Sequence, residues 1–227
     1  MAITTCIFDA YGTLFDVGAA ARGAASEPGR EALAEHWQAL AADWRQKQLQ
    51  YTWLRQITGE YVSFWQVTQD GLDWALERRG LQGDAELRER LLQLYWELDA
   101  YEEVPEVLAR LKAAGKTTAI LSNGNPEMLQ GSVEAAGLGE YLDDVLSVDS
   151  VGVYKPHHSV YDMVEERFVC ARDEVLFVSS NGWDVGSAAG YGFDTAWANR
   201  GGEPVDRLPA RPRHVLDDLR PIPELAD

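Results

Sequence analysis

The chain is poor in cysteine, with only Cys6 and Cys170 among its 227 residues. Both lie in apolar runs, which favours two buried reduced thiols over a disulfide or a metal site. No apolar run reaches the length of about 18 residues that a membrane span needs, and no basic segment followed by an apolar run opens the chain. We therefore expect a cytoplasmic protein without a membrane partner.

Positive charge is also scarce. The chain has 20 Lys and Arg residues against 37 Asp and Glu residues, a formal net charge of −17. Such a field repels phosphates, so nucleic acid is an improbable partner on electrostatic grounds. If the protein handles a small anion, local cations must overcome the general field, and we expect a small positive island at that site.

The composition is that of an ordinary globular protein, 46% hydrophobic and 25% charged. After Pro105, short apolar runs alternate with segments of helical periodicity, which predicts parallel strands joined by helices. A first apolar run opens the chain. The predicted strands are 3–8, 116–121, 144–148, 174–178 and 193–198, and the predicted helices are 107–113, 126–137 and 159–168. The Pro-rich last 27 residues are expected to wrap over the surface.

Between the first strand and the rest, residues 16–101 show helical periodicity throughout. Six of the eight tryptophans fall in this stretch, and most of them are expected to fill the core of a helix bundle. The sequence therefore predicts an α/β protein. Residues 1–15 and 102–227 form a Rossmann-like core with a parallel sheet, and residues 16–101 form an inserted helical cap domain.

Polar side chains gather where the predicted strands end. In open α/β sheets, ligands bind beyond the carboxyl ends of the strands. Each such residue alone could be a turn former or a helix cap, but the coincidence at four successive strands favours a site. These residues are Asp9 and Thr13, Ser122 and Asn123, Lys155, and Ser179, Asn181 and Asp184.

Lys155 is the only basic residue between Lys116 and Arg167. An isolated lysine usually lies on a solvated face, but this one follows a strand. At about 4 Å from Asp9 it would contribute ~4 kcal/mol of attraction at an effective dielectric of 20. That attraction would keep Asp9 ionised and usable as a nucleophile.

The segments Asp9-Ala-Tyr-Gly-Thr13, Ser122-Asn123, Lys155-Pro156 and the stretch ending at Asp184 resemble the four motifs of the haloacid dehalogenase superfamily. The resemblance extends over the whole chain and implies a Rossmann-like core with a cap inserted after the first motif. Phosphatases of the superfamily carry a second Asp at the position of Tyr11 and a further acid in the fourth motif. Here both are missing, which weakens the case for Mg²⁺.

A halide leaves without a proton, and carbon does not need the metal that offsets charge on phosphorus. The combination resembles the L-2-haloacid dehalogenases, and Trp44–Arg55 resembles their cap segment. The resemblance implies hydrolysis of L-2-haloalkanoic acids to D-2-hydroxy acids and halide through an ester on Asp9, without metal or cofactor.

The resemblance also implies a role for each site residue. Catalytic roles fall to Asp9, Thr13, Arg45, Ser122, Lys155, Ser179, Asn181 and Asp184, and substrate contacts to Tyr11, Leu49, Phe64, Asn123, Tyr161 and Trp183. Ser122 and Asn123 would hold the substrate carboxylate, and Arg45 the leaving halide with help from Asn181 and Trp183. Asp184, with Ser179, would hold Lys155 and the hydrolytic water. Without the resemblance, Arg45 would be read as a surface residue of an amphipathic helix, and Phe64 and Tyr161 as packing residues.

Two other hypotheses remain open: a phosphatase of the same superfamily acting on a small phosphate ester, and a non-catalytic binding protein on the same scaffold. The expected partners are a small 2-halocarboxylic acid, water and the halide product. A homodimer is expected from the resemblance alone.

Overall fold

The computed structural model describes residues 2–227. Its centre is a six-stranded sheet in the order β3-β2-β1-β4-β5-β6, with every neighbouring pair parallel. The strands are β1 (Thr5–Phe8), β2 (Thr117–Ser122), β3 (Asp144–Ser147), β4 (Val175–Ser179), β5 (Asp194–Ala198) and β6 (His214–Leu216). The predicted α/β class with a parallel sheet is confirmed.

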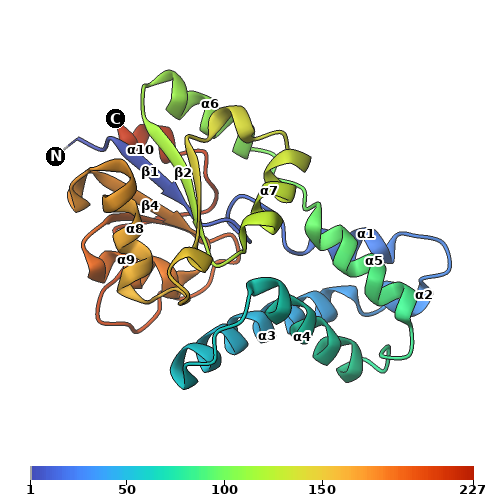
Figure 1. Ribbon diagram of the computed structural model, residues 1–227. Coiled ribbons are helices and arrows are strands. Elements are labelled where there is room, and N and C mark those ends of the chain that lie inside the picture. Colours follow the sequence, from blue (N-terminus) through green and yellow to red (C-terminus); the bar gives the residue numbers. More distant parts are fainter. Residues whose placement is uncertain (1) are drawn as a thin grey trace.

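Strand β1 lies in the middle of the sheet, between β2 and β4, and all four of its residues are buried. Helices surround the sheet, as a parallel arrangement requires (Figure 1). They are α6 (Val104–Ala113), α7 (Pro126–Ala135), α8 (His158–Phe168), α9 (Gly182–Tyr191) and α10 (Ile222–Ala226), with short 3₁₀ turns η1 (Gly139–Tyr141), η2 (Val148–Ser150) and η3 (Arg172–Glu174). Because the strands are parallel, the polar residues after β1, β2 and β4 meet at one edge of the sheet.

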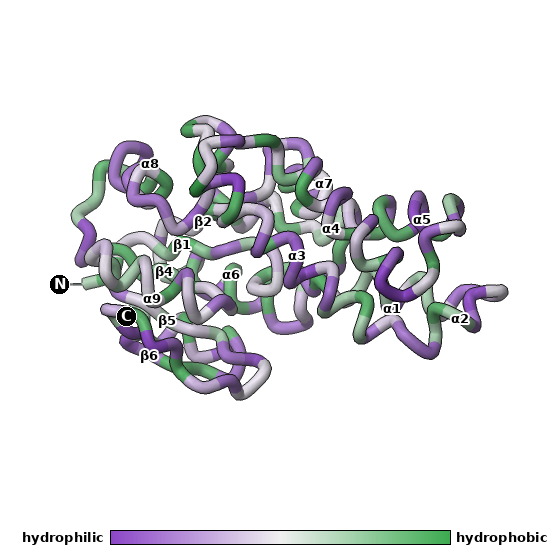
Figure 2. Tube along the Cα trace, turned by 90° about the horizontal axis from the view of Figure 1, so that it is seen from below, coloured by the Kyte–Doolittle hydropathy of each residue, from purple (hydrophilic) through white to green (hydrophobic). Residues whose placement is uncertain are grey.

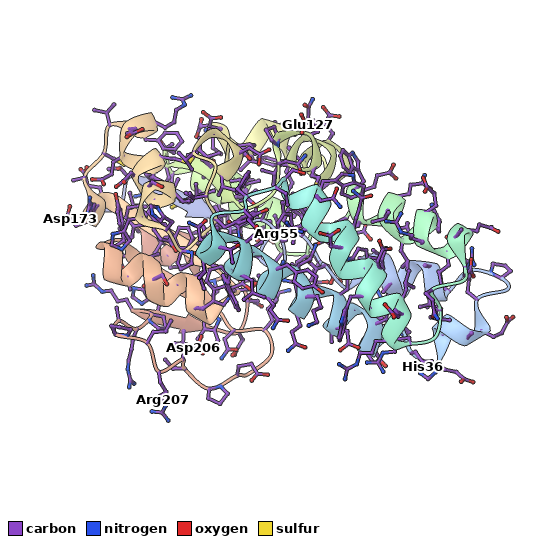
Figure 3. All side chains as sticks on the ribbon, turned by 60° about the horizontal axis from the view of Figure 1, so that its bottom comes forward. His36, Arg55, Glu127, Asp173, Asp206 and Arg207 are labelled. Atoms are coloured by element: carbon purple, nitrogen blue, oxygen red, sulfur yellow. The ribbon has the colours of Figure 1, made fainter. Side chains whose placement is uncertain are left out.

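The helical insert is the group α1 (Ala19–Ala25), α2 (Glu31–Ala34), α3 (Trp37–Thr58), α4 (Phe64–Arg78) and α5 (Ala85–Trp96). It lies beside the core and is joined to it by two paired linkers (Figure 1). The amide of Asp16 donates to Asp99 O at 2.9 Å, and that of Tyr101 donates to Leu14 O at 3.0 Å. In Figure 3, Arg55 of α3 lies at the end of the insert near the core, and His36 lies at the far end.

Helices α3 and α4 approach each other closely because Gly71 has no side chain. A Cβ atom there would lie 3.3 Å from Trp44 Cδ1 and 3.4 Å from the Gln48 amide nitrogen. Ser63 caps α4 by accepting a hydrogen bond from the Gln66 amide. Hydrophilic and hydrophobic positions alternate along α3 and α5, as expected for helices with one solvent face (Figure 2).

Two sequence expectations need correction. The last 27 residues do not only wrap over the surface, since they add the edge strand β6 and the helix α10. Of the six tryptophans in the insert, only Trp44 is fully buried, at 2% exposure, and the other five are half-buried. Four of these five still pack against the core from its margin, namely Trp37, Trp65, Trp74 and Trp96. An indole is large and carries an N–H group, so it more often sits at the margin of a small core than inside it.

Cys6 and Cys170 are both free, as expected, with Cys6 buried and Cys170 half-buried. Within the part of the chain that the structure describes, no helix combines the length and apolar character needed to cross a bilayer.

Candidate active site

Asp9 lies directly after the central strand β1 and is only 5% exposed. Its Oδ2 atom accepts hydrogen bonds from Asn181 Nδ2 and Thr13 Oγ1, both at 3.0 Å, and from Ser179 Oγ at 3.3 Å. Its Oδ1 atom accepts from Lys155 Nζ at 2.9 Å. A carboxylate held by this many donors is fixed in one orientation.

Lys155 is 1% exposed and bridges two carboxylates. Its Nζ lies 2.9 Å from Asp9 Oδ1 and 2.7 Å from Asp184 Oδ2. Burial disfavours the ammonium, but the charges of Asp184 and Asp9 outweigh that cost and raise the Lys155 pKa above its ordinary value. Lys155 is therefore a cation at neutral pH, in contact with both carboxylates.

Asp184 is completely buried, and Tyr161 lies behind it. Burial raises the pKa of the Asp184 carboxyl, while Lys155 acts in the opposite direction. The Tyr161 hydroxyl donates to Asp184 Oδ1 at 2.8 Å, which stabilises the carboxylate. The chain of contacts Tyr161–Asp184–Lys155–Asp9 fixes the Lys155 ammonium against the Asp9 carboxylate.

Arg45 reaches the site from α3 of the insert. Its Nη2 donates to the Tyr11 carbonyl oxygen at 3.0 Å and to Asn181 Oδ1 at 3.4 Å. Trp183 stands next to this guanidinium in the cavity wall and packs edge-on against Trp53 of α3, with ring centroids 5.3 Å apart. Its buried indole N–H has no partner within residues 2–227. This side of the site presents a cation and a spare N–H donor, the groups that a departing halide needs.

Ser122 and Asn123 form the opposite side, at the end of β2. Ser122 Oγ accepts from the Gly124 amide at 3.1 Å, and no acceptor within the described residues takes its own hydrogen. Asn123 Oδ1 accepts from the Lys155 amide at 2.9 Å and so fixes the backbone of that residue. A Cβ atom at Gly124 would lie 2.7 Å from the Tyr11 ring, so the loop and the ring fit only with glycine there.

Tyr11, Leu49 and Phe64 form the apolar wall. The Tyr11 ring stacks on Phe64 and on Tyr95, with centroids 5.6 and 5.7 Å apart. The inner cavity is the space that these three side chains enclose together with Asp9, Arg45, Ser122, Asn123, Lys155, Asn181 and Trp183. Its volume is about 10 Å³, which is room for about one water molecule.

Four of the fourteen predicted site residues do not line the inner cavity. Thr13, Ser179, Tyr161 and Asp184 lie behind its wall and act through other residues. Ser179 was expected to help Asp184 hold Lys155 and the hydrolytic water, but it forms no hydrogen bond with Lys155. Ser179 Oγ instead donates to Asp9 and accepts from the Asn181 amide at 3.1 Å, because β4 lies directly beside β1.

The sequence model of the haloacid dehalogenase-like hydrolase family matches residues 3–192 of the chain. The chain is 47% identical to (S)-2-haloacid dehalogenase 1 of Pseudomonas sp. strain CBS-3 over 223 residues, which cover 98% of this chain and 96% of that protein. A similar fold is found in the L-2-haloacid dehalogenase of Xanthobacter autotrophicus with chloropropionic acid covalently bound. That structure shows a TM-score of 0.84 and 38% identity, with 98% of each chain covered.

This chain belongs to the (S)-2-haloacid dehalogenases among the haloacid dehalogenase-like hydrolases. A second solved dehalogenase superimposes with a TM-score of 0.92 at 41% identity, over 98% of this chain and 96% of the other. Such agreement over full length places the insert and the core within the family together.

Mg²⁺, which phosphatases of the wider hydrolase family hold, does not fit the residues present. The two carboxylates nearest to each other in the site, Asp9 and Asp184, are both bonded to Lys155 Nζ, which stands between them. Across residues 2–227, no group of three or more His, Cys, Asp or Glu side chains is placed to hold a metal ion. A hard dication prefers several oxygen ligands, and here an ammonium occupies the space between the two that could serve.

The charges of this dehalogenase site balance. Arg45 and Lys155 are opposed by Asp9 and Asp184, and Lys155 contacts both acids. By formal charge, the expected positive island is therefore a neutral site inside an acidic protein. Of the two cations in the site, Lys155 forms ion pairs with carboxylates, whereas Arg45 forms none with any described residue.

Sequence reasoning missed several supporting residues. Tyr95 of α5 donates through its hydroxyl to Gln48 Oε1 at 3.1 Å, and Gln48 donates to Thr68 Oγ1 at 2.8 Å. This buried polar chain holds the ring on which Tyr11 stacks. Its members lie on three helices of amphipathic sequence, where a Gln or Thr carries no signal that it faces inward.

A larger outer cavity of about 640 Å³ adjoins the inner one. Arg45, Leu49, Asn181 and Trp183 line both cavities, and the outer one continues along the segment 197–206. Figure 3 labels Asp206 in this segment, at the lower edge of the core. Through this shared wall the outer cavity borders on the inner cavity that Asp9 lines.

Proposed function

We propose that the protein hydrolyses L-2-haloalkanoic acids to D-2-hydroxy acids and halide through an ester on Asp9, without a metal. The observation that carries this proposal is the buried Asp9 carboxylate, held by Lys155 on one oxygen and by three neutral donors on the other. Its relative with chloropropionic acid covalently bound supports a covalent route.

In the first step a carboxylate oxygen of Asp9 attacks C2 of the substrate. A C–O bond forms as the carbon–halogen bond breaks, and the halide leaves with the bonding pair toward Arg45 and the Trp183 indole N–H. Attack from the side opposite the halide inverts C2. Ser122 donates its free hydrogen to the substrate carboxylate on the other side of the cavity.

In the second step water attacks the ester carbonyl carbon of Asp9. The donors that hold Asp9 in the free protein then face the developing oxyanion and stabilise it. Asp184, which lies behind the cavity wall, acts on this step through Lys155, with which it remains paired. As the tetrahedral intermediate collapses, the bond between the Asp9 carbonyl carbon and the ester oxygen breaks and the C2–O bond survives. One proton of the water passes to the departing oxygen, which becomes the hydroxyl of the hydroxy acid, and the other is released to solvent. The water oxygen restores the Asp9 carboxylate.

The inner cavity must open before substrate enters, because a 2-halopropionate is several times larger than one water molecule. We assign residues 16–101 to a cap and residues 1–15 and 102–227 to the core, with the outer cavity as the entrance. Arg45 is suited to act as the gate, since its contact to Asn181 is long at 3.4 Å and its only short bond, to the Tyr11 carbonyl oxygen at 3.0 Å within the described residues, can be replaced by a bond to water.

The test is chloride release from each enantiomer of 2-chloropropionate in the presence of EDTA. Release from the L form alone, with formation of D-lactate, supports the proposal. No release from the L form contradicts it. Release of phosphate from p-nitrophenyl phosphate that depends on Mg²⁺ would instead favour a phosphatase, and absence of any turnover would favour a binding protein.

We also propose a cytoplasmic homodimer. The insert exposes apolar side chains on one helix, with Ile57 at 81% and Leu54 at 49% exposure on α3. Burial of such residues between two copies would remove apolar surface from water. Sedimentation of the wild type and of Ile57→Glu tests this: a dimer that Ile57→Glu weakens supports it, and a wild-type monomer contradicts it.

A further inference from the structure

Arg200 occupies an unusual position, two residues after β5 at the same edge of the sheet as Asp9. Its guanidinium lies 3.7 Å above the ring of Tyr101, and its Nη2 lies 2.7 Å from Glu103 Oε1. The same Nη2 donates to the Thr13 carbonyl oxygen at 3.1 Å. One side chain thus contacts the loop of the nucleophile and the linker that returns from the insert.

The partners of Arg200 are themselves tied to the active site. Thr13 Oγ1 donates to Asp9 Oδ2 and accepts from the Ser180 amide at 2.8 Å. The Tyr101 amide donates to Leu14 O at 3.0 Å, so the two linkers are already paired next to the guanidinium. Any shift of the returning linker would reach Thr13 through these contacts.

The contact with Glu103 is a largely buried charge contact and not a hydrogen bond, since Glu103 Oε1 has no hydrogen-bond partner within residues 2–227. The Glu103 side chain is 5% exposed and that of Arg200 is 21% exposed. A planar guanidinium can lie on a ring, face a carboxylate and donate to a carbonyl at once, whereas an ammonium cannot satisfy all three geometries. The site therefore uses properties that are specific to arginine.

We propose that Arg200 is a positioning residue for the dehalogenation reaction, one that holds Thr13, and through it Asp9, in the orientation for attack on C2. The proposal rests on the function proposed above. It assigns to Arg200 an effect on the rate of ester formation, because Arg200 does not line the inner cavity. Arg200 does line the outer cavity, so KM is compared in Arg200→Lys, which keeps the positive charge there and should leave substrate binding little changed.

The test compares Arg200→Lys, Arg200→Met and the matched control Glu103→Gln. Ester formation is followed in single turnovers by the mass of the peptide that contains Asp9, and folding by urea unfolding. We expect Arg200→Lys to slow ester formation about tenfold with KM within about twofold, the effect of one lost hydrogen bond. Arg200→Met should be at least as slow. Glu103→Gln keeps the bond to Thr13 and should stay within about twofold of the wild type, whatever it does to stability.

A double variant tests whether Arg200 acts on Asp9 through Thr13. In Thr13→Val, which lacks the hydroxyl that contacts Asp9, a further Arg200→Lys change should have little additional effect. A full tenfold loss in that background would show that Arg200 does not act through Thr13. An equal loss of rate in Glu103→Gln, or a wild-type rate in folded Arg200→Lys and Arg200→Met, would also overturn the proposal.

Amide exchange separates this proposal from the proposed function. The Ser180 amide, bonded to Thr13 Oγ1, and the Gly12 amide, bonded to Phe15 O, should exchange faster in Arg200→Lys than in the wild type. Unchanged exchange at both positions refutes the positioning role. If the wild type releases no halide, the proposed function fails, and exchange alone decides the role of Arg200.

Discussion

Replacement of Lys155 by methionine gives the sharpest test of the electrostatics of the site. Lys155 Nζ lies 2.9 Å from Asp9 and 2.7 Å from Asp184, so each contact supplies about 6 kcal/mol of attraction at an effective dielectric of 20. Desolvation of the three charges offsets most of this. Loss of one member of a buried ion pair typically costs about 3–5 kcal/mol, because the remaining charge has no partner.

Protonation of Asp184 removes the unpaired charge and so reduces the loss of folding stability in the variant. A carboxyl with the ordinary pKa of 3.8 takes a proton at pH 7 for about 4 kcal/mol, and this cost falls by about 1.4 kcal/mol per pH unit. Since the carboxyl is protonated more readily in the folded variant than in the unfolded chain, the stability of the variant rises as pH falls. We expect a loss of about 3–4 kcal/mol at pH 7 and about 1 kcal/mol at pH 5.

The assay is urea unfolding followed by tryptophan fluorescence at pH 5, 6 and 7, for the wild type, Lys155→Met and the control Lys116→Met. Lys116 Nζ contacts only the backbone carbonyls of Ile3 and Ala226, so its loss should be nearly independent of pH. A Lys155→Met penalty that is equal at pH 5 and pH 7 would refute the reasoning, because it would mean that no carboxylate is left uncompensated.

Three further predictions concern turnover. In a single turnover in H₂¹⁸O, label should enter Asp9 and not the hydroxy acid, as mass spectrometry of both would show; label in the hydroxy acid alone would mean direct attack of water on C2. Tyr161→Phe should move the acid limb of the pH–rate profile to higher pH, because loss of the hydroxyl removes a bond that lowers the Asp184 pKa; an unmoved limb would mean that Asp184 does not control it. Val17→Trp, which narrows the outer cavity without touching the inner one, should lower kcat/KM for L-2-chloropropionate about tenfold, whereas Val17→Ala should not; equal rates in both would place the entrance elsewhere.

The sequence was most informative where polar side chains follow directly after successive predicted strands. Asp9, Ser122 and Asn181 could be placed together because parallel strands bring their carboxyl ends to one edge, whatever the exact register. The role of Ser179 could not be placed in the same way. Its side chain points to Asp9 and not to Lys155 because of the register between β1 and β4, which sequence periodicity does not specify.

The roles of Arg200 and Gln48 could not be predicted from the sequence for a different reason. Arg200 contacts Thr13 across 187 positions, and Gln48 meets Tyr95 across 47. Neither residue has a local sequence pattern, since an arginine in a polar loop and a glutamine on an amphipathic helix both fit a solvated position. Strand β6 was missed because three residues are too few to show alternation.

The neutrality of the site favours the release of each product from it. With Asp9 and Asp184 ionised and Arg45 and Lys155 protonated, the empty site carries no net charge, and an anionic substrate brings it to −1. Ester formation neutralises Asp9 and creates a halide ion, so the total stays at −1 until the halide departs and neutrality returns. Hydrolysis restores the Asp9 charge beside the hydroxy acid and releases one proton of the water. Once that proton has left for solvent, the site again carries −1, and departure of the hydroxy-acid anion removes the excess. In an interior of low dielectric, an uncompensated charge is costly, so each product is driven out by the same imbalance that its formation creates. The Asp9–Lys155–Asp184 cluster therefore serves release as well as attack, and a positive island would have held the halide that a neutral site lets go.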